Sequence, residues 1–302
     1  MSTPPGFAHF VSLRQPPCRG QHLRPGKAGS VVFPEGEGVS FQSSALYQFL
    51  EIIMRPLRLL SFVVALGLPL AAAAQQITVS AAASLTDAFK EIGPKFEAAK
   101  AGASVRFNFA ASGVLLQQIG QGAPVDVFAS ADQETMNRGV EQKAIDAATR
   151  KDFVTNSLVL IEPAREGVGL KSLQDLSGAN VKKIAVGKVA TVPVGRYTRQ
   201  VLDGANLWTT LEPKFVQADS VRQVLDYVSR GEAEAGFVYR TDAAIAGDKV
   251  RIAFTPTGHT PVTYPIAVVA ESRQKALAGD FIAFLATPAA QEVLARYGFG
   301  KP

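Results

Sequence analysis

The stretch Ile77–Phe89, ITVSAAASLTDAF, decides the fold. A β-prone run stops at small residues and an amphipathic pattern begins directly after Ser84, which predicts a strand followed at once by a helix. The start of a helix leaves backbone N–H groups without intrahelical partners at the positive end of the helix dipole. Together with the Ser84 hydroxyl, these groups form a site suited to an anion. Ser84 and Asp87 also have the spacing of a helix-capping pair.

Three further junctions have the same form: Ser112-Gly113, Val192–Gly195 and Asp219–Val221. None carries Lys or Arg at its tip, so an anion there would be held by uncharged donors. For each serine taken alone, a plain N-cap is the open alternative. We expect the Asp219 side chain to cap its own helix and Arg222 to be solvated.

Short apolar runs alternate with amphipathic ones along residues 77–297, which predicts an α/β fold of mostly parallel sheets flanked by helices. In open sheets of this kind, ligands bind beyond the carboxyl ends of the strands. The predicted strands are 77–80, 104–109, 125–130, 157–161, 184–186, 214–216, 235–238 and 266–269. The predicted helices are 85–100, 114–120, 133–143, 195–202, 221–229, 241–246, 275–286 and 288–297, with a short helical turn at 173–176 and a loop around Trp208.

Residues 54–74 have the three parts of a secretory signal peptide: a basic start, an apolar core too short for a membrane span, and small residues before Gln75. We therefore expect export to the periplasm with cleavage before Gln75. Residues 1–53 show no sustained period of a helix or strand. We interpret them as the product of a misassigned start, with Met54 the initiator; a disordered extension is the alternative.

Removal of the leader changes the charge balance. Residues 1–74 hold six of the 31 Lys and Arg and three of the 26 Asp and Glu, which leaves 25 bases and 23 acids. This near-neutral balance gives no support for nucleic-acid binding. Cys18, the single cysteine, lies in the leader, so the mature chain has no thiol for a disulfide, a nucleophile or a metal site.

Six motifs occur in one order along the chain: Ala81–Leu85, Phe109–Gly113, Gly122–Asp132, Val192–Gly195, Gly236–Tyr239 and Arg296–Phe299. Together they resemble the periplasmic molybdate-binding proteins of ABC importers, over essentially all of residues 76–300. In that family, hydroxyls and backbone amides hold the anion at positions that match Ser84, Ser112, Val194, Val221 and Tyr239. The resemblance implies that these residues contact the oxyanion oxygens, with no direct ligation of the metal.

The resemblance implies the two-lobed type II periplasmic binding protein fold, with two interlobe crossings near 155–158 and 262–266. Lobe 1 would comprise 75–157 and 263–302, and lobe 2 residues 158–262. It implies a monomeric binding protein, not an enzyme and without a cofactor, that captures molybdate or tungstate and delivers it to a membrane permease with a separate ATPase.

The chemistry of the residues agrees with this prediction. Molybdate and tungstate carry no proton at neutral pH, so a site made only of donors satisfies them, whereas a protonated phosphate would bury an unsatisfied O–H at a cost of about 1–3 kcal/mol. Sulfate, which matches in charge and protonation, remains the alternative ligand. A hydrolase or sensor domain on the same fold is a more distant alternative; the sequence has no Gly-x-Ser-x-Gly motif.

Overall fold

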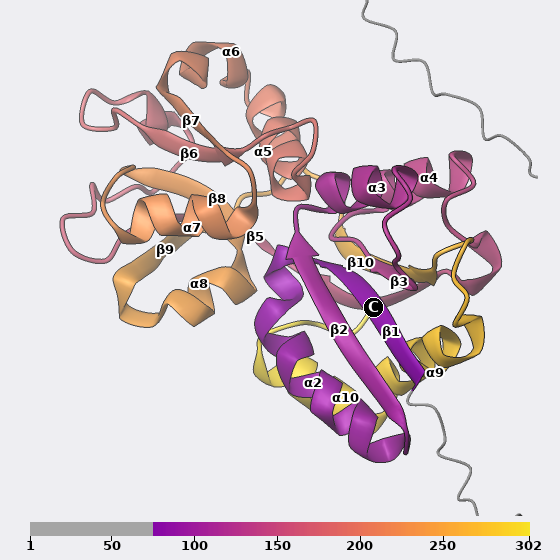
Figure 1. Ribbon diagram of the computed structural model, residues 1–302. Coiled ribbons are helices and arrows are strands. Elements are labelled where there is room, and N and C mark those ends of the chain that lie inside the picture. The colour runs from indigo at the N-terminus through magenta and orange to yellow at the C-terminus, as the bar shows by residue number, and fades with distance from the viewer. Residues whose placement is uncertain (1–74) are drawn as a thin grey trace, which may run out of the picture. The chain divides into compact units, whose positions relative to one another are not determined.

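Two five-stranded mixed sheets form the framework of the computed structural model, which describes residues 75–302 (Figure 1). Both belong to one compact unit of the chain. The predicted signal peptide, 54–74, and the segment 1–53 lie outside the described residues. Within the described part, no helix has the length and apolar character needed to cross a membrane.

The first sheet has the strand order β2-β1-β3-β10-β4. Strands β2, β1 and β3 are mutually parallel, and β10 is antiparallel to both of its neighbours. We call the part of the chain built on this sheet lobe 1. Its strands are β1 (Gln75–Ala82), β2 (Ala103–Ala110), β3 (Val127–Ala129), β4 (Lys151–Asn156) and β10 (Val262–Val268).

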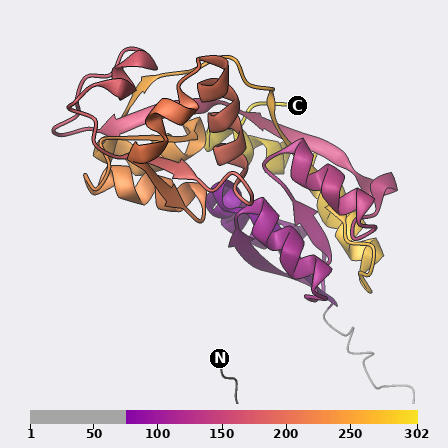
Figure 2. The same ribbon diagram turned by 90° about the horizontal axis from the view of Figure 1, so that it is seen from above.

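Helices cover both faces of this sheet, as the two views in Figures 1 and 2 show. The chain moves from β1 to β2 in one direction and from β2 to β3 in the other, so right-handed crossovers place α2 and α3 on opposite faces. The period of two in β3 fits this arrangement: Val127 and Ala129 join the core that contains Phe89 of α2, and Phe128 joins the core that contains Leu115 of α3. The helices of lobe 1 are α2 (Thr86–Ala99), α3 (Ser112–Gly120), α4 (Gln133–Glu141), α9 (Lys275–Leu285) and α10 (Pro288–Arg296).

The second sheet repeats the pattern in the order β7-β6-β8-β5-β9, with β7, β6 and β8 parallel and β5 antiparallel. We call the part built on it lobe 2. Helices α5 and α7 both pack on β6 and β8. Its elements are β5 (Leu158–Pro163), β6 (Ile184–Gly187), α5 (Pro193–Gly204), α6 (Trp208–Leu211), β7 (Phe215–Ala218), α7 (Val221–Ser229), β8 (Ala235–Tyr239), α8 (Arg240–Ala246) and β9 (Val250–Phe254).

The chain crosses between the sheets twice. Ser157 separates β4 of the first sheet from β5 of the second, and residues 255–261 lead from β9 back to β10. The predicted position of the return, 262–266, was wrong because these residues lie within strand β10. The fold class is confirmed: each sheet has three adjacent parallel strands and is flanked by helices.

Three elements differ from the sequence prediction. Strands β4 and β9 were not predicted, since the charged residues in KDFVTN and VRIAF obscure the alternation typical of a strand. Trp208 was predicted in a loop and instead begins α6, where its ring packs against Phe215 with centroids 4.7 Å apart.

Candidate functional site

A small pocket lies where the carboxyl ends of parallel strands from both sheets meet. Segments that follow β1, β2 and β3 form its lobe 1 wall, and segments that follow β6, β7 and β8 form its lobe 2 wall. The space open to the centre of a water-sized sphere is about 10 Å³, far below the roughly 300–1,000 Å³ typical of sites for drug-sized ligands, so only a small guest such as an ion fits. Among the described residues, no Lys, Arg, His, Asp or Glu lines it. The lining residues are Ala82, Ala83, Ser84, Ala110, Ala111, Ser112, Ala131, Val192, Pro193, Val194, Val221 and Tyr239.

All five residues predicted to hold the anion, Ser84, Ser112, Val194, Val221 and Tyr239, line this one pocket. Ser112 and Val221 are the first residues of α3 and α7, and Val194 is the second residue of α5. Backbone N–H groups at these positions have no acceptor within their helix and lie at its positive end. The pocket wall thus combines three hydroxyls with helix N-termini from both lobes.

The Ser84 hydroxyl faces a neighbour in its own lobe. Its Oγ lies 2.9 Å from the Oη of Tyr264, a fully buried residue of β10. The expected Ser84–Asp87 capping pair is wrong: Ser84 caps no helix, and the Asp87 carboxylate pairs with Arg222. Tyr264 is therefore the residue that positions the Ser84 side chain.

The Ser112 hydroxyl is also held by its surroundings and does not act as an N-cap. Its Oγ accepts a hydrogen bond of 3.0 Å from the backbone N–H of Ala131, which follows β3. Because an N–H only donates, the proton of Ser112 is left to point elsewhere.

At the fourth junction, Ser220 caps α7, and Asp219 pairs with Lys188 instead of capping the helix as expected.

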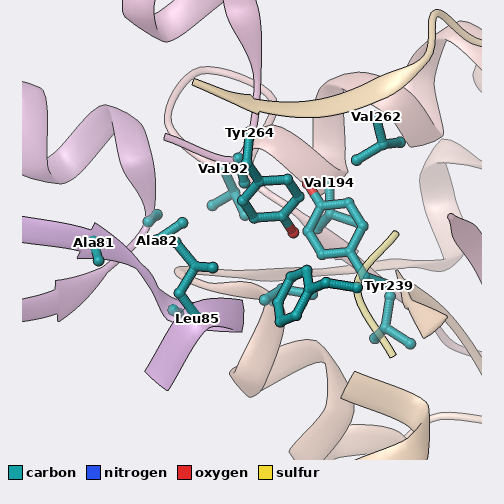
Figure 3. Close-up of a cluster of buried hydrophobic side chains, with 14 of the residues drawn as sticks. Ala81, Ala82, Leu85, Val192, Val194, Tyr239, Val262 and Tyr264 are labelled. Carbon is teal, nitrogen blue, oxygen red and sulfur yellow. The ribbon is translucent and has the colours of Figure 1, made fainter. Parts of the chain in front are cut away.

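Tyr239 ends β8 with its side chain fully enclosed, beside Val194 and Tyr264 (Figure 3). Its Oη has no hydrogen-bond partner among the described residues. A buried, unpartnered hydroxyl costs about 1–3 kcal/mol, and natural proteins rarely retain one without a reason. Burial raises the pKa of this phenol well above its usual value, so the hydroxyl stays protonated and can donate into the pocket.

Two backbones meet at the edge of the pocket. The N–H of Gly113 in lobe 1 donates to the carbonyl of Thr191 in lobe 2 at 2.9 Å. A Cβ at Gly113 would lie 2.7 Å from both Cα and O of Thr191, a distance at which one backbone would have to move. The glycine therefore permits the close approach of the lobes.

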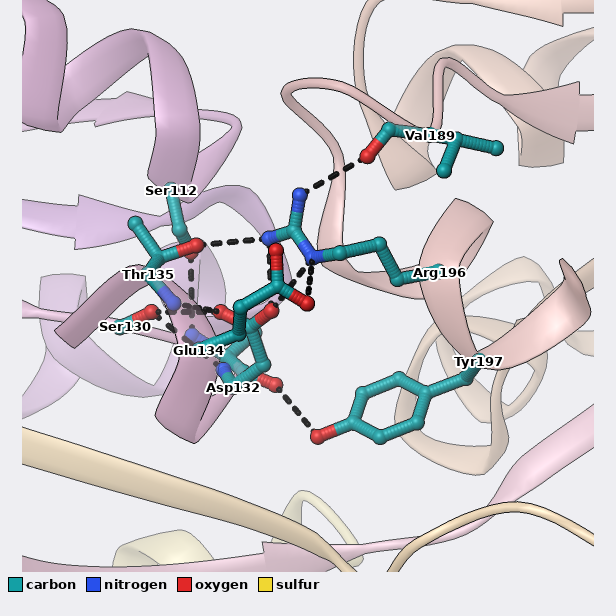
Figure 4. Close-up of polar contacts among 9 residues, drawn as sticks. Ser112, Ser130, Asp132, Glu134, Thr135, Val189, Arg196 and Tyr197 are labelled. Carbon is teal, nitrogen blue, oxygen red and sulfur yellow. Dashed lines mark hydrogen bonds and ion pairs between the residues drawn. The ribbon is translucent and has the colours of Figure 1, made fainter. Parts of the chain in front are cut away.

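A buried ion pair also joins the lobes (Figure 4). Arg196 of α5 lies 2.6 Å from Asp132, donates to the Thr135 hydroxyl at 2.6 Å, and donates to the carbonyl of Val189 at 2.9 Å. Asp132 is the N-cap of α4 and accepts from the Thr135 N–H. The guanidinium charge is thus matched beside the pocket instead of inside it.

Arg222 forms a second link between the lobes, which corrects the expectation that it is solvated. Its Nη2 lies 2.8 Å from Asp87 of lobe 1, and its Nε lies 2.7 Å from the buried Asp242 of lobe 2. The contact with Asp242 lacks the angles of a hydrogen bond and is an ion pair by proximity. Burial raises the Asp242 pKa from 3.8 to about 6, against the opposing effect of Arg222.

Sequence reasoning missed the residues that support the pocket: Asn156, Tyr264, Asp132 and Arg196. None belongs to a motif with a mechanism of its own, and each acts through a contact distant in sequence. Arg196 is two residues beyond Val194, and Asp132 ends the motif Gly122–Asp132, so proximity to a predicted donor or to a family motif is the local signal.

Comparisons with known proteins agree with this geometry. The family described as bacterial extracellular solute-binding protein matches residues 77–300. The molybdate-binding protein ModA of Escherichia coli is 42% identical over 229 residues, which cover 74% of this chain and 88% of that protein.

Two solved structures share the fold at lower identity. The periplasmic molybdate-binding protein of Azotobacter vinelandii aligns with a TM-score of 0.66 at 24% identity, covering 75% of this chain and 99% of that one. The sulfate-binding protein SubI of Mycobacterium tuberculosis aligns with a TM-score of 0.68 at 20% identity, covering 74% and 86%. By sequence and by fold, the chain belongs to the bacterial extracellular solute-binding proteins and is a relative of their molybdate-binding members.

Proposed function

We propose that this chain captures molybdate, and tungstate as its chemical analogue, in the pocket between the lobes and delivers it to an ABC import permease. The hydroxyls of Ser84, Ser112 and Tyr239 and the backbone N–H groups of Val194 and Val221 would hold the anion oxygens. The observation that carries the proposal is that these five residues, drawn from both lobes, line one small pocket without a charged side chain.

The donor set explains the class of ligand. Every oxygen of an unprotonated tetrahedral dianion accepts hydrogen bonds, and each group offered by the pocket can donate one. Charge-assisted hydrogen bonds of this kind contribute about 1.5–3 kcal/mol each. The helix N-termini supply positive potential without a cation, since Arg196 and Arg222 are matched by carboxylates.

Sulfate is the second candidate, because it has the same charge and no proton, and because the fold is shared with a sulfate-binding protein. Molybdate and sulfate differ mainly in size, so pocket dimensions would discriminate between them. The homologue at 42% identity favours molybdate.

Calorimetric titration of the purified protein with molybdate, tungstate, sulfate and phosphate tests the assignment. We expect molybdate and tungstate to bind more tightly than sulfate, and phosphate to bind least. Sulfate binding as tight as that of molybdate would transfer the assignment to sulfate, and absence of binding by all four anions would refute it.

Capture and delivery follow from the two-lobed arrangement. In the joined state, the two lobes are in contact, as they are in this structure. An anion that contacts both lobes favours this state by its differential affinity for it. The joined lobes would form the surface that the permease recognises, while a separate ATPase powers import. We propose that the protein acts as a monomer, with lobe 1 formed by 75–157 and 262–302, since Val262 begins β10, and lobe 2 by 158–261.

The proposal places the protein in the periplasm after cleavage of a signal peptide at 54–74. Mass spectrometry of the exported protein tests this: the expected first residue is Gln75, and a mature chain that begins before Met54 would contradict the proposed start.

A further inference from the structure

We propose that Asn156, Tyr264 and Ser84 form a hydrogen-bonded relay that makes the Ser84 hydroxyl donate into the pocket. We propose further that this relay selects anions without a proton. The inference rests on the proposed function and adds two residues that do not line the pocket. Asn156 ends β4, directly before the crossing at Ser157, and Tyr264 lies in β10. The relay therefore runs from the crossing between the lobes to the anion site.

The orientation of the Asn156 amide is set by the backbone. Its Oδ1 accepts a hydrogen bond of 2.9 Å from the N–H of Ser157. Its Nδ2 consequently faces the Thr241 hydroxyl at 2.9 Å and the Tyr264 Oη at 3.3 Å. An amide nitrogen only donates, so the Tyr264 oxygen is the acceptor in this contact.

The single proton of Tyr264 must then go to Ser84. Tyr264 is fully buried, and Ser84 Oγ, at 2.9 Å, is the acceptor that the described residues offer it. If Ser84 donated instead, the phenol proton would be buried without a partner, which proteins avoid. Burial raises the pKa of Tyr264 well above its usual value, so its hydroxyl stays protonated and can donate a hydrogen bond to Ser84.

Ser84 is thereby left with its own proton free for the pocket. The Ala131 N–H imposes the same polarity on Ser112, and the Tyr239 hydroxyl has no partner among the described residues. To accept a hydrogen bond from a protonated anion, Ser84 would have to turn its own proton away from the pocket. The nearby Tyr264 oxygen cannot receive that proton, because the Tyr264 hydroxyl already donates to Ser84. The relay thus penalises a ligand that carries an O–H.

Sulfate and hydrogen phosphate are the matched probes for this claim. At mildly alkaline pH both are tetrahedral dianions of similar size, and they differ by one proton. Competition of each against molybdate gives a ratio of affinities in which effects of charge and size largely cancel. This ratio isolates the preference for an unprotonated anion.

Two substitutions change the relay while preserving side-chain shape. In Tyr264→Phe, Ser84 loses the hydroxyl that donates to it. In Asn156→Asp, the new carboxylate can only accept, so the Tyr264 hydroxyl donates to Asp and the Ser84 hydroxyl then donates to Tyr264. Tyr227→Phe is the control, because it removes a half-buried hydroxyl that accepts a hydrogen bond of 3.0 Å from Gln223 within α7, away from the relay.

We expect Tyr264→Phe and Asn156→Asp each to lower the preference for sulfate over hydrogen phosphate about tenfold, the effect of one hydrogen bond to charge. Molybdate affinity should fall by a similar factor in Asn156→Asp, where the Ser84 proton turns from the anion to Tyr264, and stay unchanged in Tyr227→Phe. Wild-type ratios in both relay variants, or unchanged molybdate affinity in Asn156→Asp, would overturn the inference while leaving the proposed function intact. Failure of the wild-type protein to bind molybdate would instead refute the function on which it rests.

Discussion

Arg196 and Asp132 form an ion pair across the two lobes, with Nη2 and Oδ2 2.6 Å apart and side chains only 8% and 5% exposed. A buried pair adds little net stability over an apolar contact, but loss of one partner leaves an unmatched charge that costs about 3–5 kcal/mol. Here that cost falls on the joined state alone, because separation of the lobes returns Arg196 to water. The pair therefore makes closure sensitive to a single charge outside the anion site.

Asp132→Asn tests this link. Asn is as good an N-cap as Asp, so α4 should persist while Arg196 keeps only the exposed Glu134 carboxylate, 3.6 Å from its Nε. We expect molybdate affinity to fall about tenfold or more, and small-angle scattering to show a larger radius of gyration without ligand. The control is Asp203→Asn, which breaks an exposed i,i+4 pair with Arg199 and should change neither quantity. Equal affinity and size in Asp132→Asn and the wild type would contradict the assigned role.

Gly113→Ala should act as a steric wedge between the lobes. The added Cβ meets the Thr191 backbone at 2.7 Å, so the joined state is blocked while each lobe can still fold. We expect calorimetry to show a loss of molybdate affinity of at least about tenfold, with the melting temperature of the free protein changed by only a few degrees. Gly120→Ala, in the same helix with nothing within 4 Å of the new Cβ, should bind as the wild type does. Normal affinity in Gly113→Ala would show that this approach is not needed for binding.

Tyr239→Phe should separate stability from binding. The hydroxyl is buried without a partner among the described residues, so its removal should raise the free energy of unfolding of the free protein by about 1–3 kcal/mol. Anion affinity should fall about tenfold or more, because one charge-assisted donor is lost. Denaturant unfolding and calorimetry measure the two effects. A destabilised variant that binds molybdate normally would assign Tyr239 to packing alone.

Asp242 predicts a pH dependence of stability. Its pKa is 3.8 unfolded and about 6 folded, so between these values the folded state holds more protons than the unfolded state. The unfolding free energy contributed by this group therefore falls as pH rises through that window and is lowest above pH 6. Relative to Asp242→Asn, we expect the wild type to lose up to about 3 kcal/mol across the window. Denaturant unfolding of both proteins at several pH values measures the difference, and a constant difference or one of opposite sign would refute the assigned burial effect.

Much of the fold was predictable because its signals are local. The strand-to-helix junctions at Ser84, Ser112, Val194 and Val221 are marked by small residues and by hydrophobic periodicity, and the structure brings all of them to one pocket. The pairing of Arg196 with Asp132 was not predictable, because the partners are 64 residues apart and meet only when the lobes join.

Local patterns also misled at particular positions. Asp87 has the spacing of a capping residue, yet Arg222 of the other lobe offers it a stronger, charged partner. Tyr264 falls in the segment predicted to cross between the lobes, and its contact with Ser84 spans 180 residues. Such contacts are set by tertiary packing, so a pattern within a few residues of either partner does not contain them.

Anomalous diffraction at the molybdenum edge from crystals grown with molybdate tests the central claim most directly. The account predicts one strong peak between the lobes, with oxygens within hydrogen-bond distance of Ser84 Oγ, Ser112 Oγ, Tyr239 Oη and the N–H groups of Val194 and Val221. A peak elsewhere on the protein, or an anion bound chiefly by the guanidinium groups of Arg196 or Arg222, would contradict it.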